Sequence, residues 1–215
     1  QAFSGITDLT GTLVQGTDSS GSCRPFAVFG GSMCAVIGCA ACDHVNEQMV
    51  PVNAWGTSFH TVPVGSTVMY AYRVQAGEDN TSVTIDGGPV ILLNAGEYHQ
   101  VLNATQPVCI TGNKPISVSE IMQGMTCAGN GDPSLLMLEP DDRTSTSSSF
   151  TTLPSTQAVI LHYVSVLSQT GSIAQVQLDG TPVSSSLWNT YPACAGYSVA
   201  KIPISAGAHH ITSSA

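Results

Sequence analysis

The chain has 215 residues, a net charge of −9 and only five Lys plus Arg, so a surface that follows nucleic-acid phosphates is excluded. Charged residues make up only 9% of the sequence, which also contains 21 Gly and 12 Pro. This composition argues against long helices, whose solvent-exposed faces need charged side chains. No apolar run approaches the roughly 18 residues that would span a bilayer as a helix.

Short strand-like segments follow one another along most of the chain. Residues 66–74 and 158–166 are rich in β-branched and aromatic side chains, which favour strands. Asp86-Gly87 and Asp179-Gly180 each follow a short strand segment and carry the residue types that tight hairpin turns require. Strands at this spacing predict an all-β protein of tandem antiparallel β-sandwich domains.

The sequence also repeats itself in phase, with a period of about 92 residues. Four pairs of short strings recur at offsets between 90 and 93 residues: 24–28 with 114–118, 31–34 with 124–127, 58–63 with 149–154, and 83–90 with 176–183. Chance similarity has no reason to keep a common offset, so these strings predict a structural repeat.

The phase of the repeat predicts where each unit begins and ends. We expect residues 1–33 to be the tail strands of a unit, 34–125 a complete β-sandwich repeat, and 126–215 a second repeat that lacks its closing strands. This alignment sets Gly207-Ala208-His209-His210 against Gly96-Glu97-Tyr98-His99. The longer stretch before it, around Trp188 and Tyr197, is expected to be a hairpin or loop of the second repeat alone.

Seven cysteines in a lysine-poor chain indicate an oxidising compartment. Two cysteine pairs flank corresponding strands of the repeat, and a third pair forms a C-x-x-C that is better explained as a structural disulfide than as a redox or zinc motif. The expected pairs are Cys23 with Cys34, Cys109 with Cys127 and Cys39 with Cys42, with Cys194 left over or bonded outside the two repeat-related pairs.

Asn80-Thr81-Ser82 and Asn103-Ala104-Thr105 match the acceptor pattern for N-glycosylation, and both fall in expected turns. Together with the cysteines and the composition, they predict a secreted or cell-surface protein.

Candidate chemistry is sparse. Gly196-Tyr197-Ser198-Val199-Ala200 is one residue short of a nucleophile elbow and reads better as a strand with alternating faces. His209 and His210 are adjacent and would point to opposite faces of a strand, which makes a shared metal ion difficult. Calcium oxygens could come from Asp132, Asp141 and Asp142, although turn chemistry explains these residues as well. The polar cluster Asp43, His44, Glu47 and Gln48 fits the bracing of a loop. We therefore predict no catalytic residue, no metal and no cofactor.

A family resemblance emerges from the order of the motifs. Cys42-Asp43-His44, Glu47-Gln48, Pro51, Trp55-Gly56 and Phe59 resemble the N-terminal region of IgGFc-binding proteins, as do Lys114-Pro115-Ile116-Ser117-Val118, Gly131-Asp132-Pro133-Ser134, Asp179-Gly180 and Gly207-Ala208-His209. The resemblance covers most of residues 20–212. It implies a secreted, non-enzymatic, β-rich module of mucus or bacterial surface proteins. Antibody binding does not carry over to any particular residue.

These observations predict an extracellular structural or adhesive protein that acts by binding or assembly. The alternative is a ligand-binding module, for carbohydrate or immunoglobulin, on a larger surface protein. A secreted hydrolase is a third possibility, but no paired carboxylates or base-oriented nucleophile can be assembled from the sequence. Nucleic acid and a membrane span are not expected.

The incomplete repeat units expected at the two ends of the sequence also predict assembly. Residues 6–30 correspond to the closing strands that the second repeat lacks, so we expect them to complete it by strand addition. Completion within one chain would give a closed monomer, whereas completion between chains would give a head-to-tail filament. We favour the filament, because the intact middle repeat separates the two ends.

Overall fold

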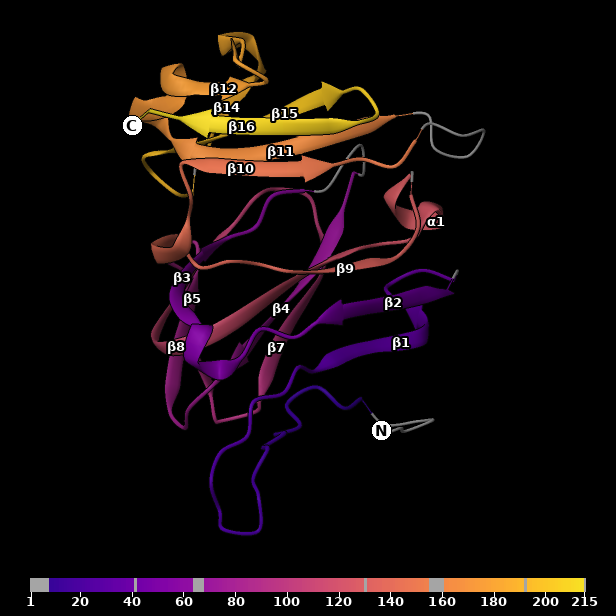
Figure 1. Ribbon diagram of the computed structural model, residues 1–215, viewed down its shortest axis with the longest axis vertical. Coiled ribbons are helices and arrows are strands. Elements are labelled where there is room, and N and C mark those ends of the chain that lie inside the picture. The colour runs from indigo at the N-terminus through magenta and orange to yellow at the C-terminus, as the bar shows by residue number, and fades with distance from the viewer. Residues whose placement is uncertain are drawn as a thin grey trace.

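A computed structural model describes residues 8–40, 42–63, 68–129, 131–154, 161–191 and 193–214. The architecture is almost entirely antiparallel β-sheet, which confirms the predicted all-β class. Figure 1 shows two layered bodies, with the strands after residue 147 at one end of the molecule and the N-terminal segment at the other. None of the described helices is long and apolar enough to cross a membrane.

The middle body, called the complete unit below, is a sandwich built on one seven-stranded sheet in which β8 is central. Its strands are β3 (Gly56–His60), β4 (Tyr70–Ala76), β5 (Thr81–Ile85), β6 (Ile91–Leu93), β7 (Tyr98–Ala104), β8 (Cys109–Met122) and β9 (Ser134–Met137). They are joined by the short helices η1 (Val52–Ala54), α1 (Met125–Ala128) and η2 (Asp141–Arg143). β9 pairs with β8, so this sheet extends past residue 125, where the complete repeat was expected to end. The domain boundaries therefore stay a prediction.

Strand β8 belongs to both layers of the complete unit. Its first part pairs with β3 and β5, and its second part pairs with β4 and β9. The chain turns between the layers at Gly112, where a Cβ would lie 2.8 Å from the carbonyl oxygen of Lys114. A residue with a side chain would clash there, so glycine permits the close approach of the backbone.

The core of the complete unit lies between these layers and includes Tyr72, Val74, Ile110, Ile116 and Val118, all at most 3% exposed. Ile116 and Val118 come from the second part of β8, so this half-strand supplies core side chains as well as hydrogen bonds.

The N-terminal hairpin pairs β1 (Phe29–Val36) with β2 (Cys42–Gln48). Its residue pairs reproduce those of β8 with β9: Phe29 lies opposite Gln48 as Ser119 lies opposite Met137. The amide of Met49 donates to the carbonyl of Val28 at 2.9 Å, as the amide of Leu138 donates to that of Val118 at 3.0 Å. Residues 28–32 therefore pair as the second part of β8 does. They directly follow the segment 24–27, and the repeat relates 24–28 to 114–118 of β8.

The C-terminal unit consists of two sheets, ordered β10-β16-β12-β13 and β11-β15-β14. Its strands are β10 (Ser147–Thr151), β11 (His162–Gln169), β12 (Val176–Leu178), β13 (Thr181–Pro182), β14 (Trp188–Thr190), β15 (Tyr197–Ile204) and β16 (Ala208–Ser213). Two short helices, η3 (Thr170–Gln175) and η4 (Ser185–Leu187), connect them. The strand expected at 158–166 is found as β11, while 158–160 and 66–67 lie outside the described residues.

The two Asp-Gly turns are equivalent, as predicted. Asp86 and Asp179 have φ of 53° and 51°, and each is followed by a glycine at positive φ, which suits a tight hairpin. The Asp86 amide donates to the carbonyl of Cys109, and its carboxylate accepts from the Cys109 amide, both at 2.8 Å. Asp179 makes the same two contacts with His210 at the same distances. His210 in β16 therefore occupies the place of Cys109 in β8.

This equivalence corrects the predicted alignment of the last strand. β16 pairs with β10 and β12 as the first part of β8 pairs with β3 and β5, while β15 pairs with β11 as β7 pairs with β4. Gly207-Ala208-His209 thus does not correspond to Gly96-Glu97-Tyr98. The predicted alignment rested on two matching residues in a Gly-x-x-His string. The strand pairing of β16 involves far more contacts, and it assigns this strand to β8. β14, as expected, is an addition specific to this unit.

Buried Glu120 in β8 gives a prediction about pH. It is 1% exposed, Oε2 accepts from the amide of Val62 at 3.1 Å, and no described residue donates to Oε1. Burial raises the pKa of this carboxyl to about 8, although the hydrogen bond from Val62 opposes the shift. The folded chain therefore keeps a proton that the unfolded chain loses above its ordinary pKa of 4.5, and stability falls as pH rises from there to about 8.

We expect Glu120→Gln to remove this loss, because glutamine cannot ionise. The gain in the free energy of unfolding at pH 8.5 should be roughly 4 to 5 kcal/mol and should vanish near pH 4. Urea unfolding at the two pH values measures it, with Glu78→Gln as an exposed control. An equal effect at both pH values would show that ionisation of Glu120 is not the cause.

Candidate binding surface

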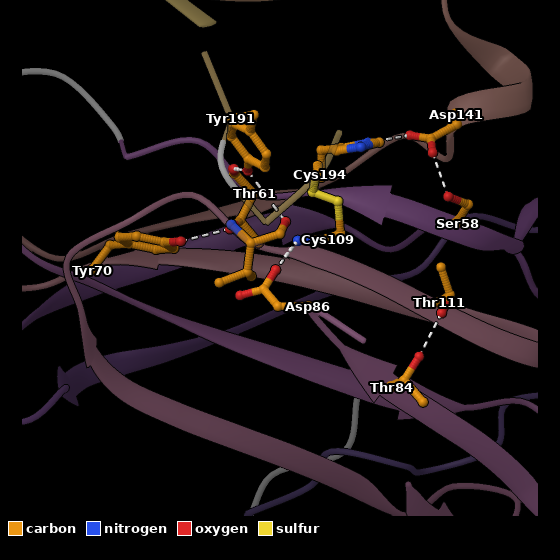
Figure 2. Close-up of a disulfide and its surroundings, with 12 residues drawn as sticks. Ser58, Thr61, Tyr70, Thr84, Asp86, Cys109, Thr111, Asp141, Tyr191 and Cys194 are labelled. Carbon is orange, nitrogen blue, oxygen red and sulfur yellow. Dashed lines mark hydrogen bonds and ion pairs between the residues drawn. A yellow bond between two sulfur atoms is a disulfide. The ribbon is translucent and has the colours of Figure 1, made fainter. Parts of the chain in front are cut away.

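The C-terminal unit is fastened to the complete unit through Tyr191, which is 3% exposed. Its hydroxyl donates to the carbonyl of Thr61 and lies 3.2 Å from the carbonyl of Val108. Thr61 in turn binds the hydroxyl of Tyr70 and accepts from the amide of Val108, so the polar groups under Tyr191 form one network (Figure 2). Burial raises the pKa of Tyr191 above its ordinary value, which keeps its hydroxyl protonated as a donor.

A disulfide reinforces the same junction. Cys194, from the stretch specific to the C-terminal unit, is bonded to Cys109 at the start of β8, with 5.7 Å between the Cα atoms (Figure 2). Figure 2 also shows Asp86 reaching the backbone of Cys109. The two units are thus joined covalently beside the Asp-Gly turn.

The predicted cysteine pairs were wrong. Only the number of bonded cysteines, six of seven, agrees with the prediction. The disulfides are Cys34–Cys42, Cys39–Cys127 and Cys109–Cys194, and Cys23 is exposed and free. The physical reason is the hairpin: β1 and β2 place Cys34 near Cys42, whereas Cys23 precedes the strand. Spacing along the repeat could not show that Cys194 reaches into the neighbouring unit.

The densest polar group of the junction does not form a nucleophile site. His60 Nδ1 donates to Asp141 at 2.7 Å, and the hydroxyl of Ser58 donates to the other carboxylate oxygen of Asp141. Partial burial raises the pKa of Asp141, but the two hydrogen bonds outweigh it and the pKa lies below its ordinary value. Both partners bind the same acid, so no described base activates Ser58 as a triad would. The nearby sulfurs of Cys109 and Cys194 are bonded to each other rather than free as metal ligands.

The other residues singled out in the sequence are spread over the surface. Asp43, His44, Glu47 and Gln48 lie on β2, not in a loop as expected, because the cluster pairs with β1 as a strand. Asp141 and Asp142 lie in η2 and Asp132 in the segment before β9, and none of them belongs to a group of potential metal ligands among the described residues.

The two glycosylation candidates are both exposed. Asn80 lies in a turn at a φ of 54°, while Asn103 lies within β7, not in the expected turn, at a φ of 58° where the strand register shifts. Their modification stays a prediction.

The two adjacent histidines have separate partners, as their alternation predicted. His209 lies 2.8 Å from Asp179, and this hydrogen bond raises the pKa of the imidazole. His210 bonds the hydroxyls of Ser147 and Ser149 on β10. An open hollow of about 460 Å³ lies over these residues. Its polar groups already bond one another, so it offers a ligand few free partners.

The most incomplete part of the molecule is the edge of β11. In the complete unit, β4 lies between β7 and the second part of β8. Among the described residues, β11 pairs with β15 on one side and with no strand on the other. From Tyr163 to Gln169, this side of β11 therefore faces no described strand and can accept another one.

The core behind this edge is correspondingly open. The repeat period of about 92 residues makes Val164 and Val166 the counterparts of Tyr72 and Val74, which are at most 3% exposed. Val164 and Val166 are only partly buried. Ile211, the counterpart of fully buried Ile110, is also only partly buried. The C-terminal unit thus lacks the side chains that Ile116 and Val118 provide in the complete unit.

A second exposed apolar edge lies on the N-terminal hairpin, beside the complete unit and away from the C-terminal unit (Figure 1). In the N-terminal segment, Phe26, Phe29, Met33 and Val36 are between 52% and 80% exposed. β1 pairs only with β2 among the described residues. Residues 24–32 do not complete the C-terminal unit of their own chain, because they lie at the opposite end of the structure.

Comparison with known proteins agrees with this picture. The family described as IgGFc binding protein matches residues 2–215. The IgGFc-binding protein of Homo sapiens is 28% identical over 193 residues, which is 86% of this chain but only 3% of the human protein. No solved structure matches the chain. The motif order, the all-β architecture and the match along nearly the whole sequence place this chain in the IgGFc-binding protein family.

Proposed function

We propose that the chain is an extracellular, non-enzymatic module that binds protein and self-associates head to tail by strand complementation into a filament or network. Family membership supports a protein ligand, and three disulfides support an oxidising, extracellular setting. Ser58 and His60, which resemble a catalytic pair, both bond Asp141 rather than each other, and this favours binding over catalysis.

One observation carries the proposal of self-association. The C-terminal unit has an open strand edge and a half-open core at β11, while the N-terminal hairpin presents an exposed apolar strand with the local structure of the missing half-strand. Exposed edges of this kind attract strands from other molecules. The two surfaces differ, so the contact is heterologous and repeats without closing unless the rotation forms a ring.

Light scattering of the purified chain over a range of concentrations tests the proposal. We expect a mass that grows with concentration, and elongated particles by electron microscopy. A variant without residues 1–30 should stay at the mass of one chain, because β11 then has no partner. A full chain that stays monomeric throughout would refute self-association. A truncated chain that assembles as well as the full chain would exclude complementation by the N-terminal segment.

Immunoglobulin binding is the second candidate, because family membership favours it. Surface-immobilised chain exposed to Fc and, as the control, to Fab fragments would test it. Equal or absent binding of the two fragments would remove this candidate.

A further inference from the structure

We infer that residues 24–32 of a second copy add to β11 in one defined register, with Val28 opposite Val166 and Phe26 inserted into the core of the C-terminal unit. This inference rests on the proposed self-association and names its surface.

The donor side of the register follows from the N-terminal hairpin. Phe29 and Ser119 occupy the same position against β2 and β9, as shown by their partners Gln48 and Met137. The correspondence holds over four successive residues, from Phe29 to Ser32, and continues at Val28 through its hydrogen bond to Met49. Continued to Phe26, it makes Val28 the counterpart of Val118 and Phe26 the counterpart of Ile116.

The acceptor side follows from β11. Val166 lies opposite Ala200 on β15 as Val74 lies opposite His99 on β7. Ala200 and His99 each lie ten residues before the residue that contacts the Asp-Gly turn, but β7 has a register shift between Val101 and Ala104 that β15 lacks. The assignment therefore rests on the repeat, whose period of about 92 residues relates 158–166 to 66–74. Val166 is thus the counterpart of Val74, and Ser165 is the counterpart of Arg73.

The complete unit then supplies the pairing. Val74 lies opposite Val118, Arg73 opposite Ser119, and Ala76 opposite Ile116. Replacing each residue by its counterpart sets Val166 opposite Val28, Ser165 opposite Phe29, and Ser168 opposite Phe26. A shift by one residue would turn Phe26 and Val28 away from the core, so burial excludes the odd shifts. Among the remaining registers, the pairing of β4 with β8 selects this one.

The chemistry of the inserted side chains fits the opening. Ile116 and Val118 are fully buried in the complete unit, and Phe26 and Val28 are apolar residues at the same two positions. At Glu120, the one acidic position of the half-strand, the donor carries Gly30, so no carboxyl is brought into the second core.

Disulfide trapping between two variants tests the register. Phe29→Cys and Ser165→Cys are made in separate chains that also carry Cys23→Ser, and the chains are mixed and mildly oxidised. Both substituted residues are exposed, so the fold should tolerate the changes. Facing positions on paired strands lie within the reach of a disulfide, whereas positions four residues away do not. Gln169→Cys, on the same face of β11, replaces Ser165→Cys in the control mixture.

We expect a covalent dimer, linked between positions 29 and 165, from the first mixture and at least ten-fold less from the control. Peptide mass spectrometry identifies the link. If light scattering shows assembly but both mixtures cross-link equally, or neither does, the register is wrong while self-association stands. If neither mixture assembles at any concentration, both the register and the proposed function are wrong.

Discussion

Replacing Phe26 by serine should weaken self-association by about 5- to 15-fold. The residue is 52% exposed in the single chain and would be enclosed in the core of the next molecule. Burying the exposed half of this side chain contributes about 1 to 1.5 kcal/mol, and each 1.4 kcal/mol is a factor of about ten in the dissociation constant. Sedimentation equilibrium of the variant and of the unsubstituted chain measures the change.

The matched control is Phe29→Ser, on the same strand. Phe29 is 65% exposed, but it corresponds to Ser119, which does not belong to the core of the complete unit. It should weaken association by less than about five-fold, since only partial burial is lost. Equal effects of the two substitutions would mean that the strand docks in another register or not at all.

Removal of the Cys109–Cys194 disulfide should lower stability by about 4 kcal/mol. The bond closes a loop of 85 residues, and in the chain-entropy account a loop of this size restricts the unfolded chain strongly. The paired substitution Cys109→Ser with Cys194→Ser leaves no unpaired thiol. Denaturant unfolding monitored by circular dichroism gives the free energy of unfolding.

Cys34→Ser with Cys42→Ser provides the comparison, because that disulfide closes a separation of only eight residues and should contribute about 2.5 kcal/mol. The Cys109–Cys194 variant should also expose Tyr191, whose contacts with Thr61 and Val108 depend on the same docking. A larger loss from the Cys34–Cys42 variant would show that loop length does not govern these disulfides.

The sequence predicted the fold class and the Asp-Gly turns because these depend on local chemistry. Asp86 and Asp179 adopt positive φ before a glycine in both units, and the flanking strands follow from their β-branched residues. The likeness of residues 24–28 to 114–118 was also informative. It pointed to the segment next to β1, whose pairing from Val28 to Ser32 matches that of β8.

Long-range pairing could not be predicted in the same way. Cys194 bonds Cys109 because an added stretch reaches the neighbouring unit, and no spacing within the repeat shows that reach. The alignment of β16 failed because Gly207 and Gly96 look alike locally, whereas the partners of β16 are those of β8. The open edge of β11 became visible only when the burial of Val164 and Val166 could be compared with that of Tyr72 and Val74.

Hydrogen exchange of β11, measured by mass spectrometry at low and high protein concentration, tests most directly whether a strand is added at this edge. In the single chain, the β11 amides that face away from β15 have no strand partner among the described residues and should exchange quickly. The account predicts that residues 162–169 and 24–32 become protected together as concentration rises, while β4 is unchanged. Assembly without added protection of both segments would contradict it.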